Sequence, residues 1–361
     1  MMKKRHILHW AMGVILTPLL GSCTSDDVVG GAGREECDII SGQPITVTSA
    51  TRSTDGSTSS TPFDFGEIVW LWANKKDGTE YINAWQLTAQ SDGRFNGNAK
   101  YWPSDGSSLT FYALHGNFGN TAITTSWADL SLTHTVETDQ STDAYKLKSD
   151  LLYAKTGSVS SKTTPAKLTF EHLLAKITVK LDLSNSVGIS KTELANAEVT
   201  LTNIQPEATI SNTLLTGNSG KTSTTGTRTT ITSGKIPSSF KSGDVIGSAI
   251  VPLQDFGGEK STSSDDNVIT ITLAYPDSRS FSYKPTSPVA LTAGNEYIYT
   301  LKIINGVLSV SSITVNKFTD NSVLKSWDIY LGELSVSDIT VNGLEQTTAD
   351  KSWDIYVESS E

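Results

Sequence analysis

The feature that most constrains the fold is a series of short segments in which β-branched and aromatic residues alternate with polar ones. Such period-two alternation is typical of strands with one buried face, and no long stretch of helical periodicity competes with it. Turn dipeptides separate the segments at Asp77-Gly78, Asp92-Gly93, Asp105-Gly106 and Asn305-Gly306. The sequence therefore predicts an all-β chain, with strands at residues 67–72, 108–113, 176–181, 198–201, 268–273 and 297–301.

The part of the chain after Arg52 is long for one β-sandwich and fits two units of about 130 residues each. We place these domains at residues 53–186 and 187–333. Residues 211–234 are rich in Ser, Thr and Gly and lack apolar alternation, which predicts a long mobile loop inside the second domain. Residues 23–52 are polar over most of their length and are expected to form a spacer or propeptide.

The first 22 residues have the order of an export signal. Lys3, Lys4 and Arg5 precede a mostly apolar stretch at residues 7–20, which is too short to span a bilayer comfortably. The stretch ends in Leu20-Gly21-Ser22-Cys23, which resembles the lipobox at which lipoproteins are acylated on cysteine. We therefore predict a signal peptide over residues 1–22 and lipid attachment at Cys23. The alternative is an ordinary secretory signal with an incidental cysteine.

Charge and chemistry argue against several classes of function. The chain carries 28 Lys and Arg against 38 Asp and Glu, and its net charge of −10 argues against binding nucleic acid. His115, His134 and His172 lack the spacing of a zinc site, and motifs for a serine nucleophile or a phosphate loop do not occur. We therefore predict that the protein is not an enzyme and needs no metal or cofactor. His172 is expected to be a packed or hydrogen-bonded residue rather than a base.

Tryptophans allow two interpretations. Their ring faces can stack on sugars, or the rings can fill the core of a sandwich. Core packing is favoured because Trp70 and Trp72 share one face of a predicted strand. The other members of the set are Trp85, Trp102 and Trp127.

The C-terminal region contains an internal repeat at an offset of 26 residues. Residues 308–316 return as residues 334–342, and the hexapeptide Lys325–Tyr330 returns unchanged as Lys351–Tyr356. Each copy is predicted to form a strand, a loop and a second strand. In the last strand Trp353, Ile355 and Val357 lie on one face, so that face is suited to burial.

Three motifs, in this order along the chain, resemble the fimbrillin family of type V pilus subunits. They are Tyr101-Trp102-Pro103 followed by residues 109–113, then residues 170–179, and finally residues 291–301. The resemblance implies two tandem transthyretin-like β-sandwich domains with a C-terminal strand extension. It also implies export as a lipoprotein, cleavage after an arginine near the N-terminus, and assembly in which a strand of the neighbouring subunit fills the groove left by the removed strand.

Carried over to this sequence, the resemblance places cleavage between Arg52 and Ser53, after an alternating stretch at residues 44–48 that fits the removable strand. Arg34 is a competing site, and an uncut chain would keep its strand. The candidate donor is the duplicated unit 334–361, with Trp353, Ile355 and Val357 as its buried face; the alternative is that both copies pack on their own domain.

The sequence thus indicates a structural or adhesive subunit of a cell-surface pilus. Its expected partners are other pilus subunits, the outer membrane through the lipid before maturation, and a host glycan or protein receptor. The alternative is a monomeric, lipid-anchored surface adhesin or carbohydrate-binding protein.

Overall fold

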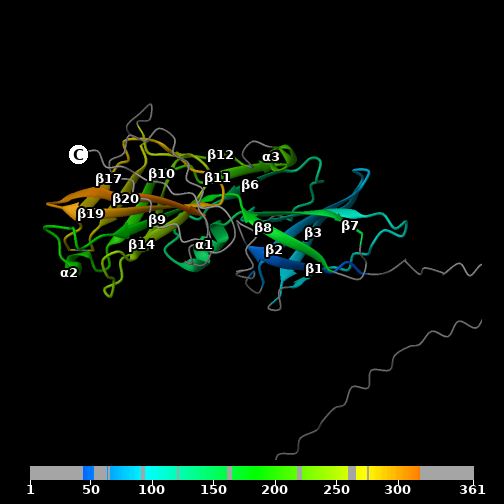
Figure 1. The fold of residues 1–361 in the computed structure, drawn as a ribbon, viewed down its shortest axis with the longest axis horizontal. Coiled ribbons are helices and arrows are strands. Elements are labelled where there is room, and N and C mark those ends of the chain that lie inside the picture. Colours follow the sequence, from blue (N-terminus) through cyan, green and yellow to red (C-terminus); the bar gives the residue numbers. More distant parts are fainter. Residues whose placement is uncertain are drawn as a thin grey trace, which may run out of the picture. The chain divides into compact units, whose positions relative to one another are not determined.

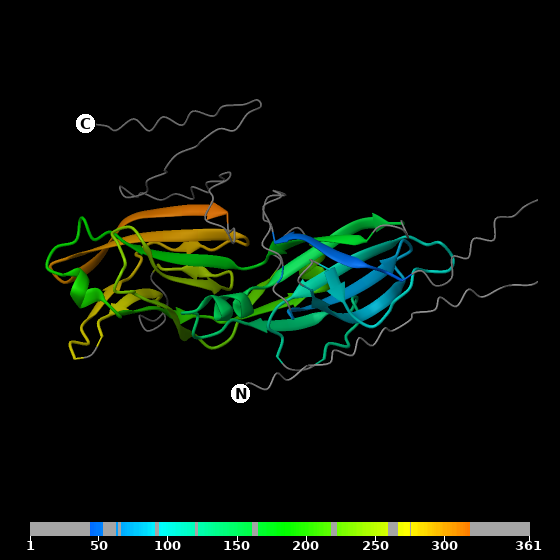
Figure 2. The ribbon, with the colours of Figure 1, turned by 90° about the horizontal axis from the view of Figure 1, so that it is seen from below.

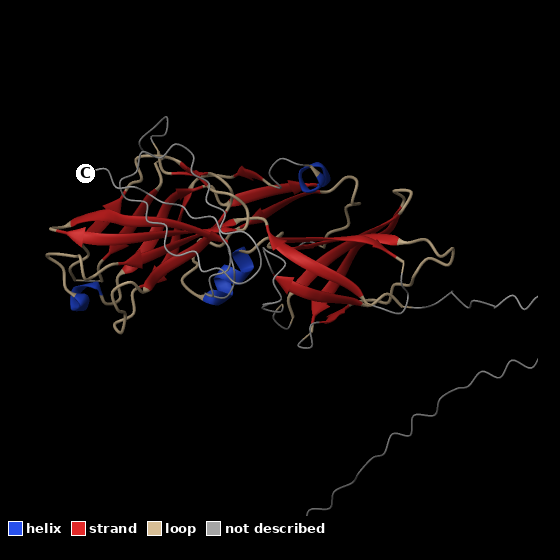
Figure 3. Ribbon diagram, viewed as in Figure 1, coloured by secondary structure: helices blue, strands red, loops and turns tan. Residues whose placement is uncertain are grey.

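The computed structural model describes residues 44–317, with gaps at 53–62, 64–65, 91–93, 120–121, 161–164, 218–221, 259–265 and 275. Strands make up most of the described chain, as Figure 3 shows, and the short helices lie between them. The expectation of an all-β fold is therefore confirmed, and each of the predicted strands is present.

The N-terminal half forms a closed barrel (Figure 1). Around the barrel, the strands are β1 (Val47–Arg52), β4 (Arg94–Asn96), β3 (Glu80–Ala89), β2 (Ile68–Lys75), β5 (Leu109–His115), β7 (Leu152–Val159) and β8 (Ala166–His172), which returns to β1. Apolar residues alternate along these strands toward one interior; in β5, for example, Leu109, Phe111 and Ala113 are fully buried. The barrel core is thus built by the same alternation that identifies the strands in the sequence.

Two four-stranded sheets dominate the C-terminal half. One has the order β13 (Thr229–Lys235), β10 (Glu198–Ile204), β16 (Val268–Thr272) and β17 (Ser280–Tyr283). The other has the order β14 (Val245–Val251), β9 (Ala175–Leu181), β19 (Asn295–Ile304) and β20 (Val307–Lys317). Gly234 and Gly247 let β13 and β14 approach closely, because a Cβ at Gly234 would lie 2.6 Å from the Ile246 carbonyl oxygen.

Smaller elements complete the chain. A three-stranded sheet joins the two halves in the order β12 (Ser223–Thr225), β11 (Glu207–Ser211) and β6 (Ser131–Thr135), and β15 (Asp255–Phe256) pairs with β18 (Val289–Ala290). The described helices are α1 (Asp143–Ser149), α2 (Lys191–Leu194) and α3 (Asn212–Thr216).

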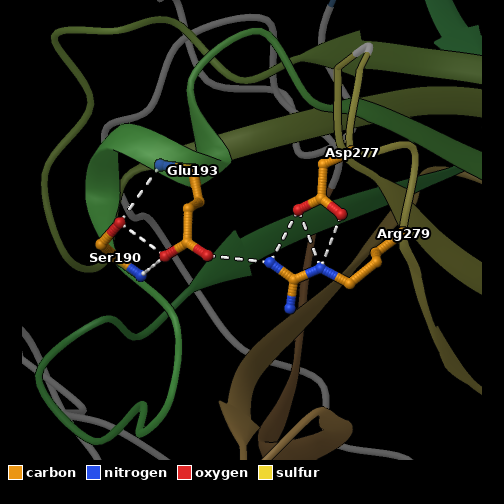
Figure 4. A network of polar contacts seen from close by, with 4 residues as sticks. All are labelled: Ser190, Glu193, Asp277 and Arg279. Carbon is orange, nitrogen blue, oxygen red and sulfur yellow. Dashed lines mark hydrogen bonds and ion pairs between the residues drawn. The ribbon is translucent and has the colours of Figure 1, made fainter.

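The helix α2 is fixed by a surface network (Figure 4). Ser190 and Glu193 form a capping box at its N-terminus, and the carboxylate of Glu193 also accepts from Nη2 of Arg279 at 2.8 Å. Arg279 is held in turn by both carboxylate oxygens of Asp277, each 2.8 Å from Nε. The network ties α2 to the turn between β16 and β17.

The expectation of a mobile loop over residues 211–234 is wrong. The structure places α3, β12 and most of β13 there. In β13 the fully buried Ile231 is followed two residues later by Ser233, which is 1% exposed and donates its hydroxyl proton to the Val199 carbonyl oxygen at 2.9 Å. A satisfied hydroxyl can occupy a core position, so a strand rich in Ser and Thr can be buried without the apolar alternation that the prediction required.

Strand pairing also connects the halves across the expected domain boundary. β9 precedes residue 186, yet it pairs with β14 and in parallel with β19. β6 likewise pairs with β11 over five registered positions. The division at residues 186 and 187 and the tandem transthyretin-like topology stay predictions.

Candidate functional site

The strand β1 closes the barrel and is the candidate exchangeable element. Its pairing with β8 is parallel, with Val47 opposite Ala166 and Arg52 opposite Phe170. A register shift interrupts this pairing between Ser49 and Thr51. On its other side, among the residues that the structure describes, β1 pairs with the three-residue β4 at two registered positions. The remaining pairings described around the barrel are antiparallel. Figure 2 shows β1, in blue, beside the green β8.

Alternate side chains hold this N-terminal segment in the barrel. Ile45 is 5% exposed and Val47 is 2% exposed, and both belong to the barrel core. The backbone is anchored before β1 begins, because Ile45 N–H donates to the Lys100 carbonyl at 2.7 Å and Ala166 N–H donates to the Thr46 carbonyl at 2.8 Å. The alternating stretch that the sequence marks as removable therefore contributes core residues.

Phe63 returns to the same place from beyond the candidate cleavage point. It is 4% exposed, and its ring packs edge-on against Phe95 of β4 at 5.4 Å between centroids and against Phe170 of β8 at 4.8 Å. It also packs against His115 of β5 at 5.2 Å. Phe63 thus contacts both strands that β1 joins. Sequence reasoning missed it because a lone apolar residue in a polar stretch gives no periodic signal.

Of the other predicted site residues, only Arg52 lies within the described part of the chain. Arg52 is the last residue of β1. Cys23, Ser53 and the donor residues Trp353, Ile355 and Val357 lie outside the described residues, so lipidation, cleavage and donation stay predictions.

Most of the tryptophans in the described part of the chain fill the interior. Trp72, Trp85, Trp102 and Trp127 are buried, whereas Trp70 is partly exposed. The ring of Trp127 stacks on Tyr112 at 4.2 Å between centroids, and Trp72 donates from Nε1 to the Thr125 carbonyl at 2.9 Å. This arrangement agrees with core packing rather than with a platform of exposed rings.

The histidines in the described ranges are buried groups of the interior. His172 is 2% exposed and its Nδ1 lies 3.0 Å from a carboxylate oxygen of Asp150; this buried pair could not be predicted from the sequence. His134 accepts from Asn117 N–H at Nδ1 and therefore donates from Nε2 to the Ser149 carbonyl at 2.9 Å. Burial lowers the pKa of His134 to about 4, so the ring is neutral at physiological pH.

Two structural features are absent from the described ranges. Within residues 44–317, outside the gaps, no group of three or more His, Cys, Asp or Glu side chains is placed to hold a metal ion. In those same ranges, no helix is both long and apolar enough to cross a membrane.

The described residues define an all-β protein with a closed barrel and packed sheets. The fimbrillin-like family matches residues 51–317, and the chain belongs to this family. This is a family of structural adhesion subunits and not of enzymes, so the protein is a fimbrial subunit of a cell-surface appendage.

Two solved structures share this fold, each with a TM-score above 0.5. A candidate cell adhesion protein from Bacteroides uniformis is similar with a TM-score of 0.55 at 19% sequence identity, over 76% of this chain and 98% of that one. Another from Bacteroides ovatus has a TM-score of 0.56 at 14% identity, over 78% and 99%. A fimbrial protein from Bacteroides vulgatus has a TM-score of 0.46 at 13% identity, over 77% and 100%. No curated protein is significantly similar in sequence.

Proposed function

We propose that this fimbrial subunit is exported as a lipoprotein acylated at Cys23, cut between Arg52 and Ser53, and assembled by strand exchange. The observation that supports the proposal is the position of β1. One short strand closes the barrel through a parallel pairing with β8, and its last residue is the candidate cleavage residue. A cut there separates the closing strand, together with the lipid, from the rest of the barrel.

Physical chemistry explains why an opened barrel would bind a neighbour. Removing β1 exposes backbone groups of β8 and β4 along with the apolar interior that Ile45 and Val47 cover. An incoming strand gains main-chain hydrogen bonds on both sides, and its alternate side chains fill the vacated positions. The segment that contains Trp353, Ile355 and Val357 has this alternation and is the proposed donor.

The proposed function assigns the subunit a location and a set of partners. Before maturation the lipid holds the precursor in the outer membrane, and afterwards the subunit lies in a fibre at the cell surface. The proposed partners are neighbouring pilus subunits, and a host glycan or protein is the proposed target of adhesion.

The test follows the full chain in a Gram-negative host. We expect N-terminal sequencing of surface material to give a start at Ser53 and gels to show a ladder of polymers. Arg52→Ala should abolish both. Trp353→Ala should abolish the ladder alone, whereas Asp354→Ala, on the opposite face of the same strand, should leave it intact. A start at Cys23 alone would reject cleavage, and a normal ladder from Trp353→Ala would reject this donor. An uncut, acylated monomer would favour the lipid-anchored adhesin instead.

A further inference from the structure

Two sheet edges in the C-terminal half are protected by residues 138–140. At β14, Nε2 of the fully buried Gln140 donates to the Ile250 carbonyl at 2.9 Å, and Ile250 N–H donates to Oε1 of Gln140 at 2.8 Å. At β13, Thr232 N–H donates to the Thr138 carbonyl at 2.8 Å, and Gln140 N–H donates to the Thr232 carbonyl at 2.7 Å. An incoming strand would need these backbone groups, so both edges are closed.

The edge of β20 differs from these two. The strand is 11 residues long and, among the described residues, pairs only with β19. From Val307 to Asn316 it contains no charged residue, no Gly and no Pro. Natural edge strands are normally short, charged or covered, and a long edge without these features pairs readily with another strand. β17, the edge strand of the other sheet, is only four residues long.

The core-facing side of β20 is also incompletely covered. Its register with β19 shifts between Val310 and Ser312, which leaves Ser311 as an extra residue. This bulge keeps Val310 and Ile313 on the side that packs against the core. Leu308 is buried, but Val310, Ile313 and Val315 are only partly buried. A further strand beside β20 would pair with the backbone along its outer edge and would cover this apolar row.

We propose that the outer edge of β20 is a docking site for residues 325–330 of the same chain, bound antiparallel. β20 ends at Lys317, and the chain continues to residue 361, so a strand that follows within a few residues can turn back onto this edge. In Lys325–Tyr330, Trp327 and Ile329 fall on one face at the spacing that the half-covered row requires.

Because of the repeat, two segments of the chain can bind at this docking site. Lys351–Tyr356 is identical to Lys325–Tyr330, so the edge of β20 can bind either copy. One copy completes the sheet of its own subunit, and the other is left over for donation. This second half of the inference rests on the proposed strand exchange, whereas the occupation of β20 does not. The duplication thereby keeps an aggregation-prone edge covered while a donor strand remains available.

Amide hydrogen exchange on the full chain tests the docking site. The probes are the β20 amides that point away from β19, which are protected only when a strand lies on the outer edge. Ile329→Pro and Ile355→Pro each remove one copy as a strand, and the matched controls Ile329→Val and Ile355→Val keep both. We expect each single proline variant to retain protection, because the other copy takes the site. The double variant should exchange roughly 100-fold faster at these amides.

Several results would overturn the inference. Outward amides that are unprotected in the unaltered chain, or that stay protected in the double variant, would show that neither copy occupies the edge. Loss of protection in Ile329→Pro alone would show that the copies are not interchangeable. Protection that appears only at protein concentrations at which the chain oligomerises would assign the edge to a second molecule.

Assembly gives a separate readout. We expect both single proline variants to lose the polymer ladder while β20 stays protected, since the remaining copy is held on its own subunit. An unaltered chain that never polymerises but shows the expected protection would reject strand exchange and leave the docking site standing. Normal ladders from both single variants would reject the idea that one copy covers β20 while the other is donated to a neighbour.

Discussion

Substituting Val47 with Ala should make the bond after Arg52 easier to cut. A protease needs an extended, unpaired substrate, and Arg52 ends a strand that is paired with β8. Cleavage therefore requires β1 to open first. Because reclosing of such a strand is fast compared with cutting at low protease concentration, the rate follows the population of the open form.

The expected magnitude follows from the burial of Val47. Its side chain is 2% exposed, and Val→Ala removes two methyl groups, each of which stabilises by about 0.8 kcal/mol when buried. The cavity left behind raises the total to about 2 kcal/mol. Since 1.4 kcal/mol changes an equilibrium tenfold, the open population and the cleavage rate should rise roughly 25-fold.

The assay is limited digestion with trypsin, with the new Ser53 N-terminus measured against time. Thr46→Val is the matched control, because Thr46 lies in the same segment with its side chain exposed. An unchanged rate at Arg52 in the Val47→Ala chain would refute the view that β1 guards this bond. An equal acceleration at tryptic sites throughout the barrel would show global unfolding rather than local opening of β1.

Three further predictions concern stability in urea and the titration of one histidine. Gln140→Ala should lower the free energy of unfolding by about 3 kcal/mol, because it leaves two backbone groups of Ile250 buried and unsatisfied; the exposed Gln86→Ala should change it little. His134 has a pKa of about 4 in the folded chain, where it is neutral, and of about 6.5 in the unfolded chain. Its contribution to the free energy of unfolding is therefore complete above pH 6.5 and is lost as the pH falls toward 4. The free energy of unfolding should therefore be about 2 kcal/mol lower at pH 5 than at pH 7, and NMR should show that the His134 ring is neutral at pH 5. Tyr299→Phe should stabilise by about 1 kcal/mol, because the Tyr299 hydroxyl is buried without a hydrogen-bond partner among the described residues; a loss of stability would contradict this.

Alternation in the sequence predicted the strands well but not their partners. β2, β5 and β9 lie where the alternating runs fall, because a half-buried strand must place apolar residues at every second position. The same pattern is silent on pairing, since it assigns side chains to a face and not to a neighbour. The parallel contact of β1 with β8 and the placement of β9 beside β14 and β19 therefore required the structure.

The burial of polar residues is the second feature that the sequence pattern did not predict. Ser233 and Gln140 are buried because each finds backbone partners that lie far away in the sequence. Their neighbours in the sequence are mostly polar or small, so the local pattern predicts that both side chains are exposed. For the candidate site, the sequence indicated an alternating stretch at residues 44–48, which overlaps β1 at Val47 and Thr48. Phe63 and the Asp150–His172 pair became visible only through long-range packing.

The geometry of β1 also bears on the order of events after a cut at Arg52. Cutting the chain does not by itself release the strand, because β1 keeps its pairing with β8 and the burial of Ile45 and Val47. Burial of these two side chains alone stabilises by about 3 to 6 kcal/mol relative to full exposure. An empty groove would in addition expose the apolar interior that β1 covers, and surfaces of that kind associate or collapse. A donor that pairs first with one edge and displaces β1 step by step avoids the empty state. The proposed strand exchange is therefore expected to proceed by displacement, with the short contact to β4 as the place where β1 yields first, since in the described part of the chain two registered positions hold it there.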